Sequence, residues 1–135
     1  MIGVVICTHA NLGPSLIDAA KMILGEFQAV DSVSVNPGES GEDIVDKLTT
    51  SIQGVDQGQG VVILCDMFGG TPSNVSLTLL SEKVEVVTGV NLPMLLKLST
   101  CRTRPLSDVA TMIQSHGREN ILVAGALLRS SGDAS

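Results

Sequence analysis

The run from Val61 to Asn74 constrains the fold more than any other part of the sequence. It opens with an unbroken apolar block, Val61–Cys65, which is followed by a single acid, Asp66, and then by two glycines. Such an apolar block is typical of a strand buried on both faces, as in a parallel sheet. The Gly69-Gly70 pair permits a tight turn. Thr71-Pro72 then predicts a helix start, with the threonine as its cap and the proline in its first turn.

A turn of this kind predicts an anion site. Backbone N–H groups that point outward at the start of a helix attract phosphate, and a phosphoryl group is therefore the first ligand to expect. The carboxylate of Asp66 opposes this expectation, because it repels an anion. The run thus predicts a phosphoryl site only if another residue lies between the anion and the carboxylate. That residue must either carry a proton or accept the phosphoryl group itself.

Strand-like and helix-like segments alternate along the whole chain. Strands are expected at 2–7, 29–35, 61–65 and 84–87, the second at a sheet edge, with a last strand-like block at 120–128. Apolar residues at helical spacing predict helices at 14–24, 40–52, 71–80, 91–98 and 106–116, the last one closed by Gly117. This alternation predicts an α/β fold, a doubly wound and mainly parallel four-stranded sheet with helices on both faces, plus a C-terminal strand. We expect one domain over residues 1–129 and a frayed tail over residues 130–135.

Composition excludes several classes of function. Eight basic and fourteen acidic residues give a net charge of -6, and aromatic content is 1%, so the chain lacks the basic stripe and stacking platforms of a nucleic-acid-binding protein. The sequence shows no signal peptide or membrane span, and its three cysteines do not form a disulfide framework. A cytoplasmic protein without nucleic-acid partners is expected.

Three predicted strands end at the same rim of the sheet, at Thr8-His9, Asp66 and Gly89–Asn91. Ligands of such sheets bind at the carboxyl ends of the strands, where the winding direction reverses. If the first and third strands are neighbours, Asp66 can accept one ring N–H of His9, which fixes the tautomer and leaves the other ring nitrogen as a nucleophile. This imidazole can accept a phosphoryl group without any metal or cofactor.

The turn that follows Asp66 supplies the remaining part of the predicted site. Amides around Gly69, Gly70 and Thr71 are expected to hold the transferring phosphoryl oxygens. A metal cluster of Cys7 and Cys65 with the histidine and the acid is a second possibility, but the spacing matches no usual zinc pattern. The two cysteines are better explained as small buried residues, and His116 as a residue at a helix end.

Three motifs follow one another along the chain: Thr8-His9, the segment Asp66-x-Phe68-Gly69-Gly70-Thr71-Pro72-x-Asn74, and Gly89-Val90-Asn91-Leu92-Pro93-Met94. Together they resemble the enzyme IIA proteins of the mannose family of the bacterial sugar phosphotransferase system (PTS). The resemblance implies that His9 is phosphorylated on its tele nitrogen, Nε2, by the carrier HPr and passes the phosphoryl group to a IIB component. It also implies that Asp66 orients His9 and that Thr71 and nearby amides contact the phosphoryl group.

The resemblance further implies a membrane IIC/IID complex, through which the sugar enters, and a homodimer that exchanges its last strand. Two departures from the family pattern are present. Ala10 stands where the family often has glycine, and Arg102-Thr103-Arg104 replaces an acidic linker of some relatives, which would affect partner choice.

Other functions remain open at the level of the sequence. One alternative is the phosphotransfer subunit of a dihydroxyacetone kinase, which also carries the phosphoryl group on a histidine. Another is a regulatory module that is controlled by phosphorylation of His9 and takes no part in sugar transport. A receiver-type module phosphorylated on Asp66 would need an acidic pair after the first strand, where Thr8-His9 stands. Met67 and Phe68 form either an exposed docking patch or the inner side of the loop, and the sequence does not decide between these two.

Overall fold

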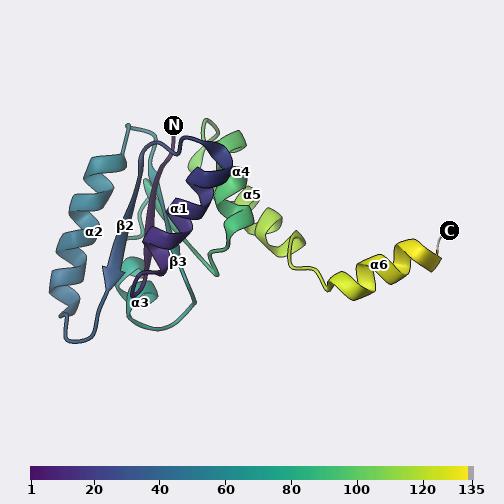
Figure 1. The fold of residues 1–135 in the computed structure, drawn as a ribbon. Coiled ribbons are helices and arrows are strands. Elements are labelled where there is room, and N and C mark those ends of the chain that lie inside the picture. Colours follow the sequence, from purple (N-terminus) through teal and green to yellow (C-terminus); the bar gives the residue numbers. More distant parts are fainter. Residues whose placement is uncertain (134–135) are drawn as a thin grey trace.

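The computed structural model describes the backbone of residues 1–133 and the side chains of residues 1–130. Strands and helices alternate through most of the chain, as expected (Figure 1). In chain order they are β1 (Gly3–His9), α1 (Leu12–Leu24), β2 (Val30–Val35), α2 (Gly41–Val55), β3 (Val61–Cys65), α3 (Thr71–Leu77), β4 (Val84–Thr88), α4 (Leu92–Cys101), α5 (Leu106–Glu119) and α6 (Ala124–Asp133).

The four strands form one parallel sheet in the order β2-β1-β3-β4. β2 is an edge strand, as its alternating pattern predicted. β1 and β3 are neighbours, with Cys7 paired to Cys65 in the last register position. The winding direction therefore reverses between these two strands, and the predicted meeting point of their carboxyl ends is confirmed.

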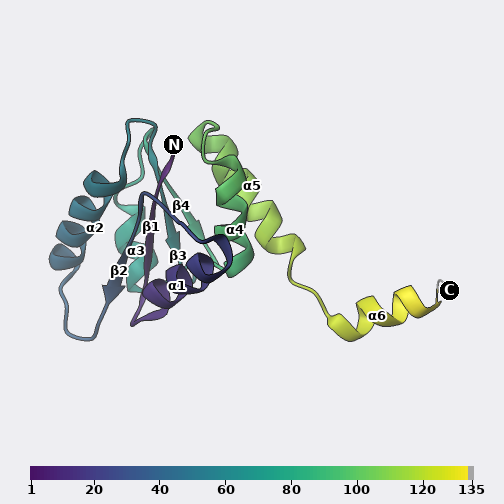
Figure 2. The ribbon, with the colours of Figure 1, turned by 45° about the horizontal axis from the view of Figure 1, so that its top comes forward.

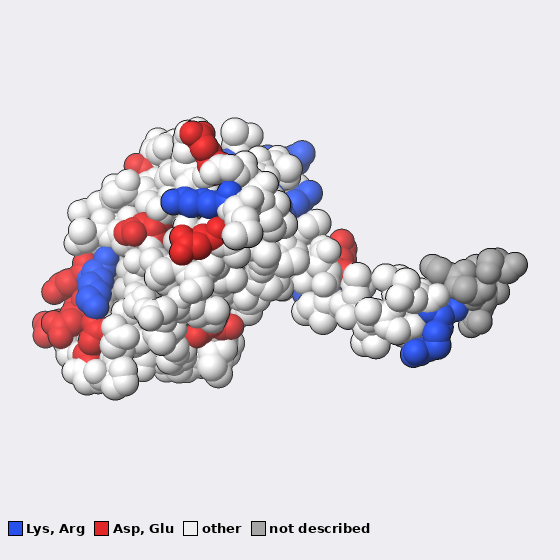
Figure 3. All heavy atoms as spheres, viewed as in Figure 1, with Lys and Arg blue, Asp and Glu red and all other residues white. Residues whose placement is uncertain are grey.

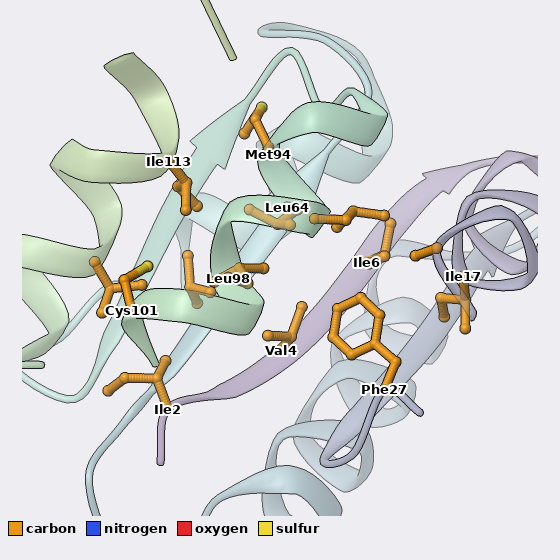
Figure 4. Close-up of a cluster of buried hydrophobic side chains, with 14 residues drawn as sticks. Ile2, Val4, Ile6, Ile17, Phe27, Leu64, Met94, Leu98, Cys101 and Ile113 are labelled. Atoms are coloured by element: carbon orange, nitrogen blue, oxygen red, sulfur yellow. The ribbon is translucent and has the colours of Figure 1, made fainter. Parts of the chain in front are cut away.

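Helices cover both faces of the sheet (Figure 2). Val4 and Ile6 of β1 face the layer of α1, α4 and α5, as Figure 4 shows, whereas Val5 and Cys7 face the layer of α2 and α3. All four side chains are fully buried. Burial of such an aliphatic side chain contributes about 1.5–3 kcal/mol, so the central strands anchor the fold and hold their carboxyl ends in place.

Arg102 lies in this core rather than at a partner-facing surface. Its guanidinium donates hydrogen bonds to the carbonyl oxygens of Ile2, Gln28 and Ala29, and it lies 5.6 Å from the ring centroid of Phe27. Burial lowers the pKa of this guanidinium. The side chain of Arg102 thus ties the start of β1 to the segment before β2. Thr103 and Arg104 are exposed, and an effect of the segment Arg102-Thr103-Arg104 on partner choice stays a prediction.

The single chain does not form the predicted C-terminal strand over residues 120–128, and a strand exchanged with a second chain stays a prediction. Asn120 caps the end of α5, residues 121–123 are irregular, and the rest belongs to α6, which projects away from the sheet (Figures 1 and 2). A strand without a neighbour leaves its backbone groups unpaired, whereas a helix satisfies them internally. Residues 130–133 form the end of α6, while residues 134–135 of the predicted frayed tail lie outside the described residues.

Two helix ends differ from the prediction. α3 has Gly70 at its N-cap, and Thr71 is the first helical residue without a capping hydrogen bond. Gly117 lies inside α5, where an added Cβ would lie 2.5 Å from Cγ of Met94. Its small size is therefore needed for the packing of α5 on α4, and not for ending the helix. Among the described helices, none has the length and apolar character needed to cross a membrane.

Candidate functional site

His9 and Asp66 meet at the carboxyl ends of the two central strands. His9 is the last residue of β1, and Asp66 directly follows β3. The ring Nδ1 of His9 lies 2.7 Å from Oδ2 of Asp66, and the backbone N–H of His9 donates to the same oxygen at 3.1 Å. The His9 side chain is 49% exposed and that of Asp66 is 14% exposed. The acid is thus enclosed, while the ring faces solvent.

The charge of Asp66 decides which ring nitrogen is free. Burial by itself raises the pKa of this carboxyl, but the hydrogen bonds from the ring and the backbone N–H of His9 outweigh burial and hold the pKa below its ordinary value of 3.8. Asp66 is therefore ionised at neutral pH and can only accept hydrogen bonds. Assigned from this network, the proton of the neutral imidazole sits on Nδ1, and Nε2 carries the free lone pair.

The double-glycine turn brings backbone against this free edge of the ring. Gly69 and Gly70 both have positive φ values, 86° and 83°. A Cβ added to Gly70 would lie 3.3 Å from Cε1 and 3.5 Å from Nε2 of His9, whereas one added to Gly69 would meet nothing within 4 Å. Glycine at position 70 is thus required both by the backbone conformation and by the closeness of the imidazole.

The amides of the turn are not equivalent. The Gly69 N–H donates to Oγ of Ser73 at 3.2 Å, and the Met67 N–H donates to Oδ1 of Asp66 at 3.1 Å. Within the described part of the chain, the N–H groups of Gly70 and Thr71 have no hydrogen-bond acceptor. The role of Ser73 was missed from the sequence, because the residue expected at the third helical position of a capping box is Glu or Gln and not serine.

The residues that flank His9 fix the end of β1. Thr8 is fully buried, and its Oγ1 accepts a hydrogen bond from the Gly13 N–H at 2.8 Å. Ala10 adopts a φ of 49° and donates its N–H to the Val35 carbonyl at 3.1 Å. A non-glycine residue in this region is strained, so Ala10 allows the loop fewer conformations than glycine would.

The third predicted strand end, Gly89–Asn91, makes hydrogen bonds that hold the structure next to the site. The Val90 N–H donates to the Cys65 carbonyl at 3.0 Å, which ties the end of β4 to β3. The side chain of Asn91 caps α4 by accepting from the Met94 N–H at 3.2 Å. This segment therefore holds structure next to the site and makes no hydrogen bond to His9 or Asp66.

The structure also shows the positions of the other residues that the sequence analysis singled out. Met67 and Phe68 are 52% and 75% exposed, so the inward-folded alternative is wrong. Cys7 and Cys65 are fully buried, and the pKa of the Cys7 thiol is raised by its hydrogen bond with Cys65 and by burial. The described residues include no cluster of three metal-ligating side chains. His116 lies in the last turn of α5, as expected for a residue at a helix end.

Charge on the molecule is uneven. Acidic side chains gather over α2, where Glu42, Asp43 and Asp46 are exposed with Lys47 among them (Figure 3). The hydrogen bonds and ion pairs of His9 and Asp66 involve no lysine or arginine of the described residues. The N–H groups of Gly70 and Thr71 are therefore hydrogen-bond donors that this chain offers to an anion at the rim.

Comparison with known proteins identifies the family. A family model, EIIA-man, described as the PTS system fructose IIA component, matches residues 3–117. The mannose-specific EIIAB component of Escherichia coli (strain K12) is 32% identical over 124 residues, which make up 89% of this chain and 38% of that protein. The chain thus spans well under half the length of that relative.

Relatives of similar length agree with this match. The PTS system fructose-specific EIIA component of Bacillus subtilis (strain 168) is 28% identical over 126 residues, covering 91% of this chain and 86% of the relative. The crystal structure of a phosphotransferase system component EIIA from Streptococcus agalactiae superposes with a TM-score of 0.84 at 26% identity, covering 93% of this chain and 99% of that one. The chain belongs to the EIIA-man family of PTS IIA components.

Proposed function

We propose that this protein is a phosphocarrier of a bacterial sugar phosphotransferase system, and that Nε2 of His9 is its phosphoryl acceptor. The proposal gives this chain the role that its family and the names of its relatives indicate. The observation that carries it is the pairing of His9 Nδ1 with Asp66 at 2.7 Å, which leaves Nε2 free beside Gly70.

The transfer step requires little beyond this geometry. The lone pair of Nε2 attacks the phosphorus of a phosphohistidine donor, and the bond between phosphorus and the donor's ring nitrogen breaks as the new bond forms. Nδ1 keeps its proton, and the Asp66 carboxylate offsets the positive charge that the ring gains. The reverse sequence delivers the phosphoryl group to the acceptor protein.

The turn after Asp66 is the proposed cradle for the phosphoryl oxygens. Gly70 and Thr71 offer N–H groups without acceptors in the described chain, whereas the Gly69 N–H already donates to Ser73. Gly69 therefore contributes to the cradle by its backbone conformation, and Gly70 and Thr71 by hydrogen bonds. A fixed array of donors of this kind stabilises developing charge without reorganisation.

The proposed partners are proteins. HPr would donate the phosphoryl group and a IIB component would receive it, with a membrane IIC/IID complex moving the sugar, and the chain would work in the cytoplasm. The half-exposed ring of His9 at the sheet rim suits transfer between two protein surfaces. We also propose a homodimer, because exposed apolar side chains gather in the C-terminal segment at Ile121, Leu122, Val123, Leu127 and Leu128.

The function is tested by labelling. The protein is incubated with phosphoenolpyruvate, enzyme I and HPr, and intact-mass spectrometry then counts the phosphoryl groups bound. One group, labile in acid and stable in base, is expected on His9.

The only other histidine provides a matched control. His9→Gln should take no label, whereas His116→Gln should be labelled as fast as the wild type. Absence of label on the folded wild type would overturn the proposal, and an acid-stable, base-labile label would point to the Asp66 carboxylate instead.

A further inference from the structure

Ser73 is a buried polar residue next to the site to which the transfer step assigns no role. It is the third residue of α3 and has no exposed surface, and its Oγ accepts the Gly69 N–H at 3.2 Å. We infer that Ser73 is a positioning residue, which holds the Gly69-Gly70 turn against His9 and thereby sets the rate of phosphoryl transfer. The inference rests on the proposed function.

The pattern of this hydrogen bond differs from that of an ordinary capping box. In a capping box the side chain at the third helical position accepts the N–H of the N-cap residue. The N-cap of α3 is Gly70, but Ser73 accepts the N–H of the preceding residue, Gly69. The bond therefore anchors the turn while it leaves the Gly70 N–H available to a phosphoryl oxygen.

Few other contacts fix this turn. The Met67 N–H is held by Asp66 Oδ1 at 3.1 Å, and the Gly70 carbonyl accepts the Asn74 N–H at 2.9 Å. Between these points the exposed Phe68 and the two glycines have wide conformational freedom. The bond from Gly69 to Ser73 is thus the tie between the middle of the turn and the protein body.

Small displacements of the turn matter because its backbone is so close to the imidazole. A Cβ on Gly70 would lie 3.5 Å from Nε2, so the Gly70 backbone borders the place where the phosphoryl group must sit. Misplacement of a positioning group by about 1 Å can cost as much as ~100-fold in rate. Loss of the hydrogen bond between Gly69 and Ser73 is expected to cause part of that reduction in rate.

Ser76 provides a matched control on the same helix. It is also fully buried, and its Oγ donates to the Pro72 carbonyl at 2.7 Å and accepts from Cys65 Sγ at 3.5 Å. Ser76→Ala therefore removes a buried hydroxyl of α3 without touching the turn. Ser73→Ala removes the same chemical group together with the anchor of Gly69.

The kinetic experiment measures single-turnover transfer from phospho-HPr to each variant by rapid quench at several donor concentrations. Ser73→Ala should lower the maximal rate by roughly tenfold with the half-saturating donor concentration unchanged, because the anchor acts on the reacting geometry and not on docking. Ser76→Ala should transfer at the wild-type rate. Equal maximal rates for Ser73→Ala and wild type, or equal losses in both alanine variants, would overturn the inference.

A second measurement separates this inference from the proposed function. Amide hydrogen exchange by NMR on the unphosphorylated proteins should show the Gly69 N–H exchanging about tenfold faster in Ser73→Ala than in wild type or Ser76→Ala, as expected for the loss of one hydrogen bond. Unchanged exchange at Gly69 would refute the anchor itself. A wild type that takes no phosphoryl group would instead refute the proposed function, whatever the exchange rates show.

Discussion

At the scale of single residues, Asp66 determines what His9 can do. Its carboxylate accepts the ring N–H at 2.7 Å and fixes the tautomer with Nε2 free. Asp66→Asn offers an amide that can donate to Nδ1, which favours the opposite tautomer with a protonated Nε2. We expect transfer from phospho-HPr to slow by roughly 100-fold in a folded protein, since a wrong tautomer removes the nucleophile. Rapid-quench kinetics measure this, and an unchanged rate would refute the orienting role.

The same carboxylate makes stability depend on pH. The pKa of Asp66 is lower in the folded protein than its ordinary value of 3.8, so its stabilising contribution is complete above that value. The contribution is lost as the pH falls through the lower folded-state pKa. In urea titrations, wild type should therefore lose more stability than Asp66→Asn as the pH is lowered from 5 to ~2. Parallel losses in both proteins would contradict the assigned hydrogen bonds.

The two glycines of the turn make a matched pair for mutation. Both have positive φ, but only a side chain at position 70 would meet the His9 ring. Gly69→Ala should cost about 1 kcal/mol of stability through backbone strain and slow transfer less than Gly70→Ala does, because a side chain at position 69 would not meet the imidazole. Gly70→Ala should in addition displace the imidazole and reduce transfer by more than tenfold. Comparing transfer rates at equal folded fraction tests this, and equal rates in the two variants would contradict the close approach.

At the scale of elements, Arg102 connects α4 to the starts of β1 and β2. Its guanidinium donates to the buried carbonyl of Ile2 and to the part-buried carbonyls of Gln28 and Ala29, and Arg102→Ala removes all three hydrogen bonds. A loss of roughly 2–4 kcal/mol in unfolding free energy is expected. The exposed neighbour Arg104 is the control, and Arg104→Ala should change stability by less than ~0.5 kcal/mol. Similar urea midpoints for the two variants would show that Arg102 is not a structural tie.

Periodicity predicted the elements that the sheet organises. Buried strands of unbroken apolar residues and amphipathic helices carry their patterns locally, so β1 to β4 and α1 to α5 were expected near their observed positions. That the first and third strands are neighbours could only be assumed from the sequence, and the observed strand order confirms this assumption. The burial of Arg102 depends on contacts between segments that are distant in the sequence, and no local pattern encodes it.

The segment after α5 shows where local patterns fail. The composition of residues 120–128 resembles a strand, yet a strand needs a neighbour to accept its backbone hydrogen bonds. Among the described residues no strand pairs with this segment, and α6 forms there instead. At the site, the approach of His9 to Asp66 followed from topology, whereas the hydrogen bond from Gly69 to Ser73 depends on how the turn folds back over the start of α3.

At the scale of the whole molecule, the exposed C-terminal segment is the feature least suited to a solitary chain. Deletion of residues 121–135 should convert the proposed homodimer to a monomer, because Ile121, Val123 and Leu128 are 76%, 74% and 70% exposed. Sedimentation equilibrium should give twice the chain mass of 14.0 kDa for the full chain and a single-chain mass for the deletion variant. Met22→Glu, which alters another exposed apolar residue, should remain dimeric. A monomeric full chain would exclude the homodimer.

The proposed function depends on which atom of the molecule carries the phosphoryl group. The structure pairs Nδ1 with Asp66 and leaves Nε2 beside the Gly70 backbone. The most direct measurement is a long-range proton–nitrogen correlation NMR spectrum of the histidine rings after phosphorylation by phosphoenolpyruvate, enzyme I and HPr. Phosphorus coupling on Nε2 of His9, with Nδ1 still protonated, is the predicted result. A phosphoryl group on Nδ1, on His116 or on Asp66 would contradict the account.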